Sequence, residues 1–298
     1  MSQGATAPPV EAPRPASVAA AVVTFHPDRA LEERLAALSP LVSAIILVDN
    51  GSAPDELRSD RLASLGGKLQ LIANGRNRGV AAALNQGFAR ARTLGLPWLL
   101  ALDQDSEPLP CLVEAAARVF DSHPLPARLA AIGAGIAGEI PSDPASQHPF
   151  ERRPVLITSG TLYPLSVWES MGGFREDFFI DYVDIEYCLR ARARGLEVVQ
   201  STEPCLVHRI GQPAARRVLG RWVTPTHHDA TRRYYITRNR IAVWRGYALT
   251  ETRYVLHDIR AFTRETFMLV VAESDRLAKI RAMWAGIRDG SLGRSRRR

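Results

Sequence analysis

Four short apolar runs, separated by helical patterns, dominate the first hundred residues of this chain. Each run is bounded by turn residues, which is typical of strands buried on both faces of a parallel sheet. The runs cover residues 18–25, 44–48, 69–73 and 98–102, and the helical patterns between them cover 29–38, 54–65 and 80–94. We therefore predict right-handed βαβ units and an α/β fold of the Rossmann-like kind, with a mostly parallel central sheet and flanking helices.

The pattern becomes less regular after residue 105, and it turns helical from about residue 228 onward. In the middle part we expect helices over 110–120, 165–171 and 184–194, strands over 129–133 and 155–159, and a polar loop over 138–150. The later helices are expected over 234–247 and, with breaks, over 254–287. The fold is thus expected to end in a C-terminal helical extension.

Composition and pattern together predict the domain organisation. Residues 1–17, rich in Pro and Ala, predict a disordered leader, residues 18–227 the main domain, and residues 228–298 the helical extension with a basic tail. Hydrophobic residues make up 46% of the chain and charged residues 23%, which excludes a collagen-like, coiled-coil or wholly disordered chain. The three cysteines show no CxxC spacing, which argues against a disulfide framework or a thiolate zinc site and favours a reducing cytosol.

Positive charge is concentrated at the C-terminal end. The net charge is +7, and residues 273–298 supply +5 of it, from eight Arg or Lys against three acids. Such a tail attracts anionic lipid or nucleic acid, and charge does not separate the two. Within it an apolar stripe runs beside basic residues at helical spacing. The stripe is Leu277, Ile280, Trp284 and Ile287, and the basic residues are Arg276, Lys279, Arg281 and Arg288.

This amphipathic segment predicts peripheral docking on an anionic membrane surface, at the inner face of the cytoplasmic membrane. No uncharged apolar stretch reaches the ~20 residues that a spanning helix needs. Packing of the stripe on the main domain or on a second subunit fits the pattern nearly as well. A homo-oligomer is therefore an alternative prediction.

Polar residues follow the apolar runs, where ligands of open α/β sheets bind. Asp49 lies in the sequence DNGS after the second run, and Asp103 and Asp105 lie in DQDS after the fourth. Two carboxylates at i and i+2 can share a hard cation such as Mg²⁺ or Mn²⁺. Asx-rich turns explain both sequences as well. Residues 74–87 place small and polar residues at the mouth of a helix, which suits either phosphate or an ordinary connection.

The densest acidic cluster lies in residues 172–186, where five carboxylates stand among aromatic residues. Asp184 and Glu186 would begin a helix, where the helix dipole favours the charged form and keeps a base ionised at neutral pH. Helix capping is the plainer interpretation of these acids. His208 follows another apolar stretch and is a candidate metal ligand, although a lone histidine is more often structural. Arginines in TRRYYITRNR, residues 231–240, fit either phosphate binding or a solvated helix face.

Six segments of the chain, taken in order, resemble the family 2 glycosyltransferases of the GT-A fold. They are VVTFHP, VDNGS, NRGVAAALNQG, LDQDS, SGTLYP and GGFREDFFIDYVDIEYCLRARARG. More narrowly, LDQDS and FFIDYVDIEYCLR, with YYITRN after them, resemble bacterial rhamnosyltransferases of cell-surface polysaccharide assembly. The resemblance covers roughly residues 20–245.

The resemblance implies a donor side of the site. It implies that Thr24 and Asp49 line the nucleobase and ribose pocket, with Asn77 and Gly79 nearby. Asp103 and Asp105 match the DxD element of the family, in which Asp103 faces the nucleotide-sugar and both acids serve a metal ion. His208 matches a further metal ligand of the family.

It also implies an acceptor side. Ser159 and Gly160 match a turn of small residues beside the transferred sugar, and Asp181 lies on the same side. Asp184 matches the general base, the second acid of a Glu-Asp pair. The first position of that pair is Val183 here, so the choice between Asp184 and Glu186 stays open.

The function implied is an inverting, metal-dependent sugar transfer with Mg²⁺ or Mn²⁺. The resemblance points to L-rhamnose from dTDP-L-rhamnose, and to a lipid-linked or oligosaccharide acceptor of O-antigen, capsule or related synthesis. A UDP- or GDP-sugar donor is an alternative on the same fold. A basic nucleic-acid-binding protein is an alternative of another class, disfavoured because the basic excess is terminal and no helix-turn-helix or zinc-finger motif occurs. A catalytically silent scaffold is a third.

Overall fold

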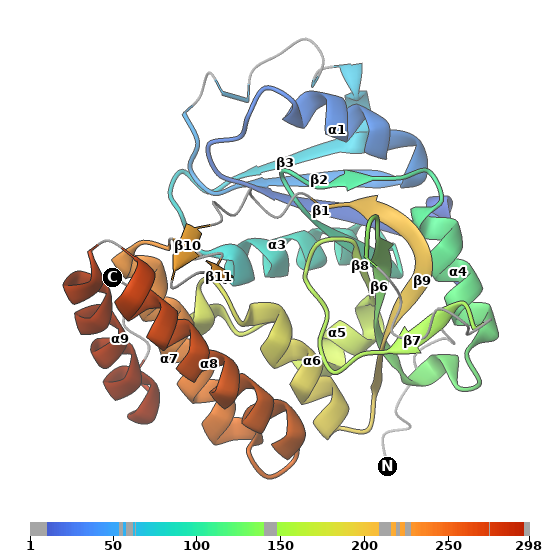
Figure 1. The fold of residues 1–298 in the computed structure, drawn as a ribbon. Helices are drawn as coiled ribbons and strands as arrows, with labels where there is room; N and C mark the ends of the chain where they lie inside the picture. Colours follow the sequence, from blue (N-terminus) through green and yellow to red (C-terminus); the bar gives the residue numbers. More distant parts are fainter. Residues whose placement is uncertain are drawn as a thin grey trace, which may run out of the picture.

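The structure is a computed structural model that describes residues 11–53, 56–57, 62, 64–139, 148–208, 216–218, 221–223, 228–273 and 275–294. Its centre is a curled nine-stranded sheet in the order β3-β2-β1-β4-β8-β6-β9-β5, with β7 paired to β9 (Figure 1). The first four strands are all parallel, as predicted. They are β1 (Val18–Thr24), β2 (Ala44–Asp49), β3 (Leu69–Ala73) and β4 (Trp98–Asp103).

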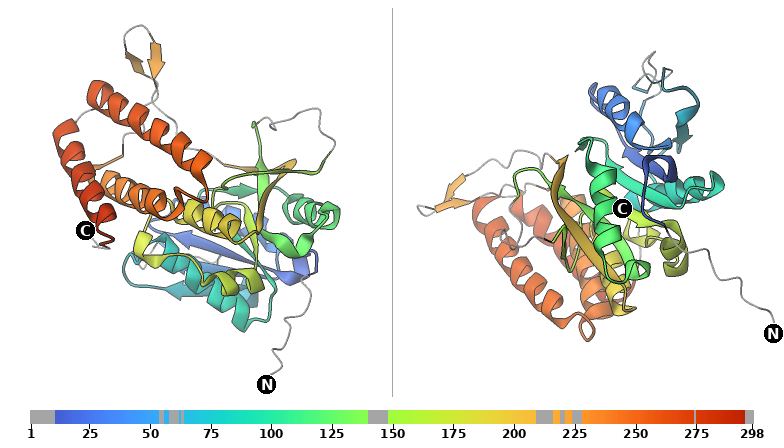
Figure 2. Two further views of the ribbon diagram at one scale, coloured as in Figure 1. Left: turned by 90° about the horizontal axis from the view of Figure 1, so that it is seen from below. Right: turned by 90° about the vertical axis from the view of Figure 1, so that its right-hand side faces the viewer.

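The second half of the sheet is mixed, unlike the mostly parallel sheet that we expected. β8 is antiparallel to both β4 and β6, whereas β9 is parallel to β6 and antiparallel to β5 and β7. These strands are β5 (Glu107–Pro108), β6 (Leu129–Ile136), β7 (Phe150–Arg152), β8 (Thr161–Pro164) and β9 (Glu197–Val207). β10 (Arg216–Val218) and β11 (Arg221–Val223) form a separate hairpin that projects from the molecule (Figure 2).

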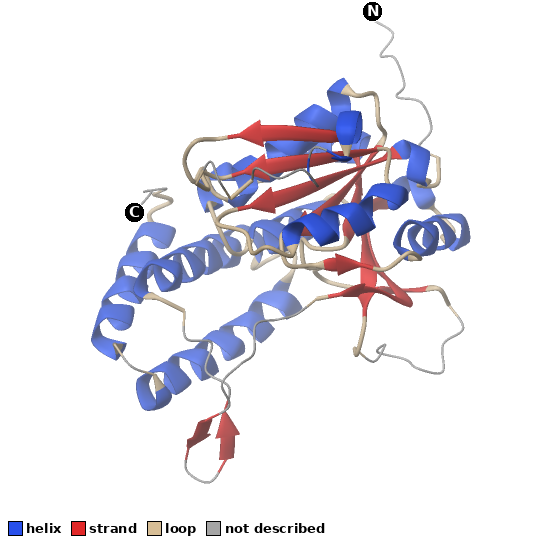
Figure 3. Ribbon diagram, turned by 90° about the horizontal axis from the view of Figure 1, so that it is seen from above, coloured by secondary structure: helices blue, strands red, loops and turns tan. Residues whose placement is uncertain are grey.

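Helices cover both faces of the sheet (Figure 3). Alternate residues of β1 and β2 point to opposite faces, which is why these strands are apolar throughout. On one face lie α1 (Leu31–Leu38) and α4 (Leu112–Ser122); on the other lie α3 (Val80–Thr93), α5 (Leu165–Met171) and α6 (Val183–Ala193). Short 3₁₀ turns occur at Pro15–Ser17, Ser39–Leu41, Gly66–Lys68, Pro126–Arg128 and Glu176–Phe178.

Two predicted segments differ from the structure, and others lie outside the described residues. Residues 155–159 form no strand, because Gly160 turns the chain at a φ of 76° and the strand begins only at Thr161. The predicted leader is ordered over residues 11–17: Ala12 packs against the core and the Trp98 indole donates to the Glu11 carbonyl at 2.8 Å. Residues 1–10, most of the predicted helix over 54–65 and most of the polar loop over 138–150 lie outside the described residues.

The C-terminal helices α7 (Ala230–Tyr247), α8 (Thr252–Ala272) and α9 (Arg276–Ser291) lie together on one side of the molecule (Figure 2). α9 packs against α7 through small residues. A Cβ atom at Gly286 would lie 2.8 Å from the Tyr234 carbonyl oxygen, and one at Gly290 would lie 2.6 Å from that of Arg238. The packing face is therefore not the stripe expected from the sequence, of which Leu277 and Trp284 remain exposed.

Candidate active site

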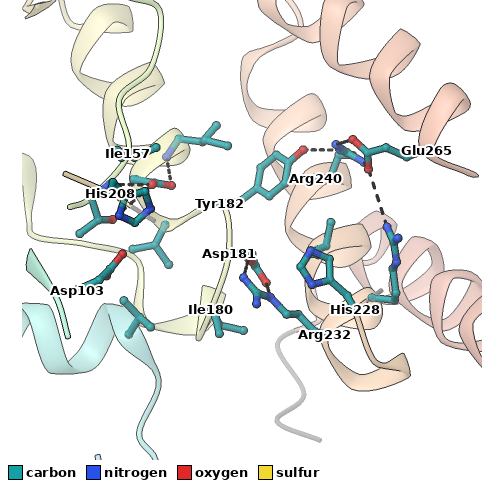
Figure 4. Close-up of a pocket in the computed structure, with 17 residues that line it drawn as sticks. Asp103, Ile157, Ile180, Asp181, Tyr182, His208, His228, Arg232, Arg240 and Glu265 are labelled. Atoms are coloured by element: carbon teal, nitrogen blue, oxygen red, sulfur yellow. Dashed lines mark hydrogen bonds and ion pairs between the residues drawn. The ribbon is translucent and has the colours of Figure 1, made fainter. Parts of the chain in front are cut away.

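A cavity of about 540 Å³ lies between the end of β4 and the N-terminal half of α7 (Figure 4). Its walls come from parts of the chain that are far apart in the sequence: the DQDS segment, residues 157–158, residues 180–185, His208 and α7. Asp103 and His208 stand on one side, and His228 and Arg232 stand on the other. The carboxyl end of β4 thus opens into a polar cavity, as ligand sites in α/β sheets do.

Asp103, Asp105 and His208 come together at this edge. Each offers one ligand atom, and these atoms lie within 4.8 Å of one another. The Ser106 hydroxyl lies 3.0 Å from Nδ1 of His208, and a metal would then be bound by Nε2. The two carboxylates suit Mg²⁺ or Mn²⁺, and the imidazole adds a nitrogen ligand of the kind that transition-metal ions take.

The electrostatics of Asp103 also fit a cation. Burial raises the pKa of its carboxyl from 3.8 to about 6, and the neighbouring Asp105 carboxylate adds to that rise. Two acids held this close repel each other unless a positive charge lies between them. The residues present therefore fit a divalent ion.

Asp184 lies at the start of α6 and faces the same cavity. Its Oδ2 accepts hydrogen bonds from the Thr158 backbone N–H at 3.0 Å and from the Thr158 hydroxyl at 3.4 Å. Burial raises the pKa of Asp184 above its ordinary value, and hydrogen bonds from Ile185 and Thr158 offset the rise only in part. We expected the helix dipole to lower the basicity of this carboxylate; burial outweighs that effect and makes it a stronger base.

Glu186, the other candidate base, points away from the cavity. Its side chain is only 2% exposed, and its carboxylate accepts hydrogen bonds from Arg190 at 3.0 Å and from the Tyr247 hydroxyl at 2.8 Å. It is not among the residues that line the cavity. Its contacts join α6 to α7.

Asp181 lines the cavity and is paired with α7. Its two oxygens accept hydrogen bonds from Arg232 at 3.0 Å each (Figure 4). It lies in a turn in which three residues other than glycine have positive φ: 64° at Phe179, 60° at Asp181 and 63° at Tyr182. Backbone outliers of this kind gather at functional sites.

The predicted donor-side residues lie at the ends of β1 and β2 and before α3. The Thr24 hydroxyl donates to Gln104 at 2.9 Å, which ties β1 to the DQDS segment. Asp49 closes the DNGS turn, accepting from the backbone N–H of Gly51 at 3.0 Å. Asn77 accepts from Gly79 N–H at 2.9 Å. A Cβ atom at Gly79 would lie 2.6 Å from the Phe179 carbonyl oxygen, so only glycine fits there.

Ser159 and Gly160 lie behind the metal-ligand cluster, and neither lines the large cavity. The Ser159 hydroxyl donates to Ser106 at 2.6 Å and accepts from the Asp103 backbone N–H at 3.2 Å. A side chain at Gly160 would meet Leu206 on β9. Ser159 therefore fixes the DQDS segment through hydrogen bonds, and Gly160 allows β9 to pack closely beside it.

The sequence did not single out the wall that α7 contributes. His228, which the sequence pattern leaves as a surface residue or a domain contact, lines the cavity. For the arginines of residues 231–240, on α7, the sequence suggested either phosphate ligands or a solvated helix face. Arg233, Arg238 and Arg240 are instead buried among protein partners, and only Arg232 is half exposed. Their alternation with Tyr234 and Tyr235 was the available signal, because a solvated helix face rarely carries buried aromatics.

A second cluster joins β9 to the start of α4. Ligand atoms of Cys111, Glu203 and Cys205 also lie within 4.8 Å of one another, although the two cysteines are far apart in sequence. Glu203 pairs with Arg118, and burial raises the pKa of the Cys205 thiol.

The comparison with known families agrees with this arrangement. The profile described as Glycosyl transferase family 2 matches residues 23–188, more than half of the chain. The chain belongs to glycosyltransferase family 2. This glycosyltransferase is 30% identical over 247 residues to the dTDP-rhamnosyl transferase RfbF of Shigella flexneri, over 75% of this chain and 78% of RfbF.

Solved structures share the GT-A fold. GalNAc-T7 with UDP, GalNAc and Mn²⁺ has a TM-score of 0.61 at 13% identity, covering 80% of this chain and 49% of GalNAc-T7, so this chain spans about half of that protein. TarS 1-349 of S. aureus in complex with UDP-GlcNAc has a TM-score of 0.58 at 15% identity, covering 92% of this chain and 81% of that one. At these identities the likeness concerns the fold alone.

The site predicts pH-dependent metal binding. A metal must displace the proton of Asp103, whose pKa is about 6, so the apparent affinity for Mn²⁺ should fall at least tenfold between pH 7 and pH 5. Titration calorimetry at the two pH values measures this. Asp103→Asn should bind Mn²⁺ weakly at both. Equal affinity of the wild-type protein at pH 5 and pH 7 would contradict the assignment.

Proposed function

We propose that this glycosyltransferase transfers L-rhamnose from dTDP-L-rhamnose to a hydroxyl group of a lipid-linked or oligosaccharide acceptor in cell-surface polysaccharide synthesis, with inversion at the anomeric carbon. The observation that carries the proposal is that Asp103, His208 and Asp184 line one cavity, with Asp105 clustered beside Asp103 and His208. The relative RfbF, a dTDP-rhamnosyl transferase by name, supports the choice of donor.

The donor diphosphate belongs at the end of β4. Asp103, Asp105 and His208 would hold a Mg²⁺ or Mn²⁺ ion there. An ion held there would supply Lewis acidity toward the negative charge of the nucleoside diphosphate leaving group. Thr24, Asp49, Asn77 and Gly79 shape the neighbouring loops, in which the nucleoside would lie.

The acceptor hydroxyl belongs beside Asp184. Its oxygen forms a bond to the anomeric carbon while the bond from that carbon to the diphosphate breaks, and its proton passes to the Asp184 carboxylate. The raised pKa of Asp184 makes it a better proton acceptor than an exposed aspartate. Thr158 holds the carboxylate in place through Oδ2. Such a general base contributes about 10²–10⁴-fold in rate.

Donor identity is tested by hydrolysis of nucleotide sugars, because transfer to water needs no acceptor. We expect release of dTDP from dTDP-L-rhamnose at least tenfold faster than release of UDP or GDP from their sugars, and dependent on Mg²⁺ or Mn²⁺. Asp105→Asn is the matched inactive control. Preference for a UDP- or GDP-sugar would overturn the donor assignment, and binding of nucleic acid without any nucleotide sugar would overturn the function.

The base is tested by a pair of variants. Asp184→Asn should lower kcat by about 10²–10⁴-fold while the protein still binds dTDP, because only the proton acceptor is lost. Glu186→Gln is the matched control, since Glu186 lies outside the cavity. Its kcat should stay within about fivefold of wild type, although unfolding shifts to lower temperature. The reverse order of effects would assign the base to Glu186.

Exposed apolar and basic side chains on α8 and α9 support the proposal that the enzyme docks on a membrane. No helix in the described ranges is long and apolar enough to cross a bilayer. Several large apolar side chains are nevertheless exposed, among them Leu277 at 69%, Trp284 at 67% and Phe267 at 58%. Exposed arginines stand beside them on the same helices. These are Arg253, Arg260 and Arg264 on α8 and Arg276, Arg281 and Arg288 on α9.

Apolar side chains flanked by arginines suit the headgroup layer of an anionic membrane better than open water. This is also where a lipid-linked acceptor would lie. The basic residues favour anionic lipid over a second copy of the chain, whose corresponding surface would carry the same charge.

Vesicle sedimentation tests the docking surface. The wild-type protein should pellet with vesicles that contain phosphatidylglycerol and much less with pure phosphatidylcholine. The double variant Phe267→Ser/Trp284→Ser should reduce pelleting at least tenfold, because it loses two apolar side chains that the membrane would bury. Leu125→Ser, at an exposed leucine after α4, is the control and should pellet like wild type. Equal pelleting of all three proteins would contradict the proposal. So would a double variant that binds lipid like wild type but no longer forms a dimer that the wild-type protein forms.

A further inference from the structure

The turn before the catalytic helix α6 is held in a conformation that its own residues do not favour. Phe179 has φ 64° and ψ −65°, and the Ile180 N–H donates to the Phe178 carbonyl at 2.7 Å. This is the rare, strained form of the γ-turn. Asp181 and Tyr182 follow at φ 60° and 63°. None of the three is glycine, so the surroundings must impose this shape.

One side chain of α7 bonds to the backbone on both sides of Phe179. Asn239 is fully buried, at 0% exposure, and its Nδ2 donates to the carbonyl oxygens of Phe178, Ile180 and Asp181 at 2.9 Å each. Its Oδ1 accepts from Arg238 at 2.8 and 3.0 Å. The Asn239 amide therefore binds three carbonyl groups of the turn and holds them toward α7.

Other contacts fix the rest of the turn. The Phe179 carbonyl accepts a hydrogen bond from the Val80 N–H at 2.7 Å, directly after Gly79. The Phe179 ring stacks on Tyr235, with ring centroids 5.0 Å apart. The Tyr182 hydroxyl donates to Asp258 on α8 at 2.9 Å. The Asn239 side chain, however, bonds to the carbonyl groups on both sides of Phe179 and to that of Asp181. Its neighbour Arg238 donates to the carbonyl groups of Asp177 and Phe178, where the turn begins.

We propose that Asn239 is a positioning residue for sugar transfer. Its amide holds the strained turn so that Asp181 and, two residues beyond the turn, Asp184 face the cavity. The inference rests on the proposed function, because it takes Asp184 as the base. It differs from a simple packing role, in which loss of Asn239 would lower stability and leave the chemistry of the folded protein intact.

Asn239→Asp tests the proposal with the smallest change. The variant keeps the size of the side chain and an oxygen toward Arg238, but it removes both donor hydrogens from the turn. We expect kcat to fall about 10²-fold, since a shift of about 1 Å in a reacting group has this effect. The Kd for dTDP with Mn²⁺ should stay within threefold of wild type. Hydrogen exchange should become faster in peptides spanning residues 177–185 and stay unchanged in those of α4.

Asn85→Asp is the matched control. Asn85 lies outside the cavity and donates to the Phe174 carbonyl at 2.9 Å, just before the strained turn. Its variant should lose stability but keep kcat within threefold. Asn239→Gln, which retains the amide but displaces it by one methylene, is a second variant and should also lower kcat with dTDP affinity retained.

The proposal is overturned if folded Asn239→Asp keeps a kcat near that of wild type. It is also overturned if Asn239→Asp and Asn85→Asp lose kcat to the same extent, each in proportion to its loss of stability. It is also overturned if neither variant of Asn239 yields folded protein that binds dTDP, because the residue is then structural. A wild-type protein that transfers no sugar would instead refute the proposed function, and the hydrogen-exchange contrast would still report on the turn.

Discussion

The turn at residues 178–182 is the constraint on which the site depends. Three residues there hold positive φ without glycine, at a cost of about 1–3 kcal/mol each. Folding can sustain this only because the start of α3 and the helix α7 meet at the turn. Gly79 gives it room, the Asn239 amide binds its carbonyl groups, and Tyr235 covers its aromatic ring. The C-terminal helices thus contribute directly to the shape of the cavity, and are more than an appendage to the domain.

Buried ion pairs hold these helices in place. Arg240 pairs with Asp258 at 3.2 Å and with Glu265 at 3.0 Å, and Glu273 joins Arg233 to Lys279 at 2.9 and 2.8 Å. Breaking a buried pair leaves an uncompensated charge, so the arrangement of α7, α8 and α9 is strongly specified. This explains why Arg233 and Arg240 on α7 are internal, which their sequence pattern alone did not indicate.

Much of the fold could be predicted from local pattern, and the failures have physical causes. β1, β2 and β4 were predicted because strands covered on both faces are apolar throughout. The edge strand β3 was predicted from the same kind of apolar run, although Leu71 in it is exposed. β9 was missed because Gln200, Ser201 and Glu203 interrupt its apolar pattern on a mixed, twisted part of the sheet. The Asp103 and Asp105 pair could be predicted because it follows a strand directly. The separate fates of Asp184 and Glu186 could not, because they depend on partners such as Tyr247 that lie about 60 residues away.

The central proposal is that Asp103, Asp105 and His208 would hold a divalent ion at the cavity that the Asp184 carboxylate also lines. Anomalous diffraction at the manganese edge, on crystals grown with Mn²⁺ and dTDP, measures this most directly. The account predicts a manganese peak bound by Asp103, Asp105 and His208, with the diphosphate on the ion and the Asp184 carboxylate across the cavity. A peak at Cys111, Glu203 and Cys205 alone, or a nucleotide bound away from Asp184, would contradict it.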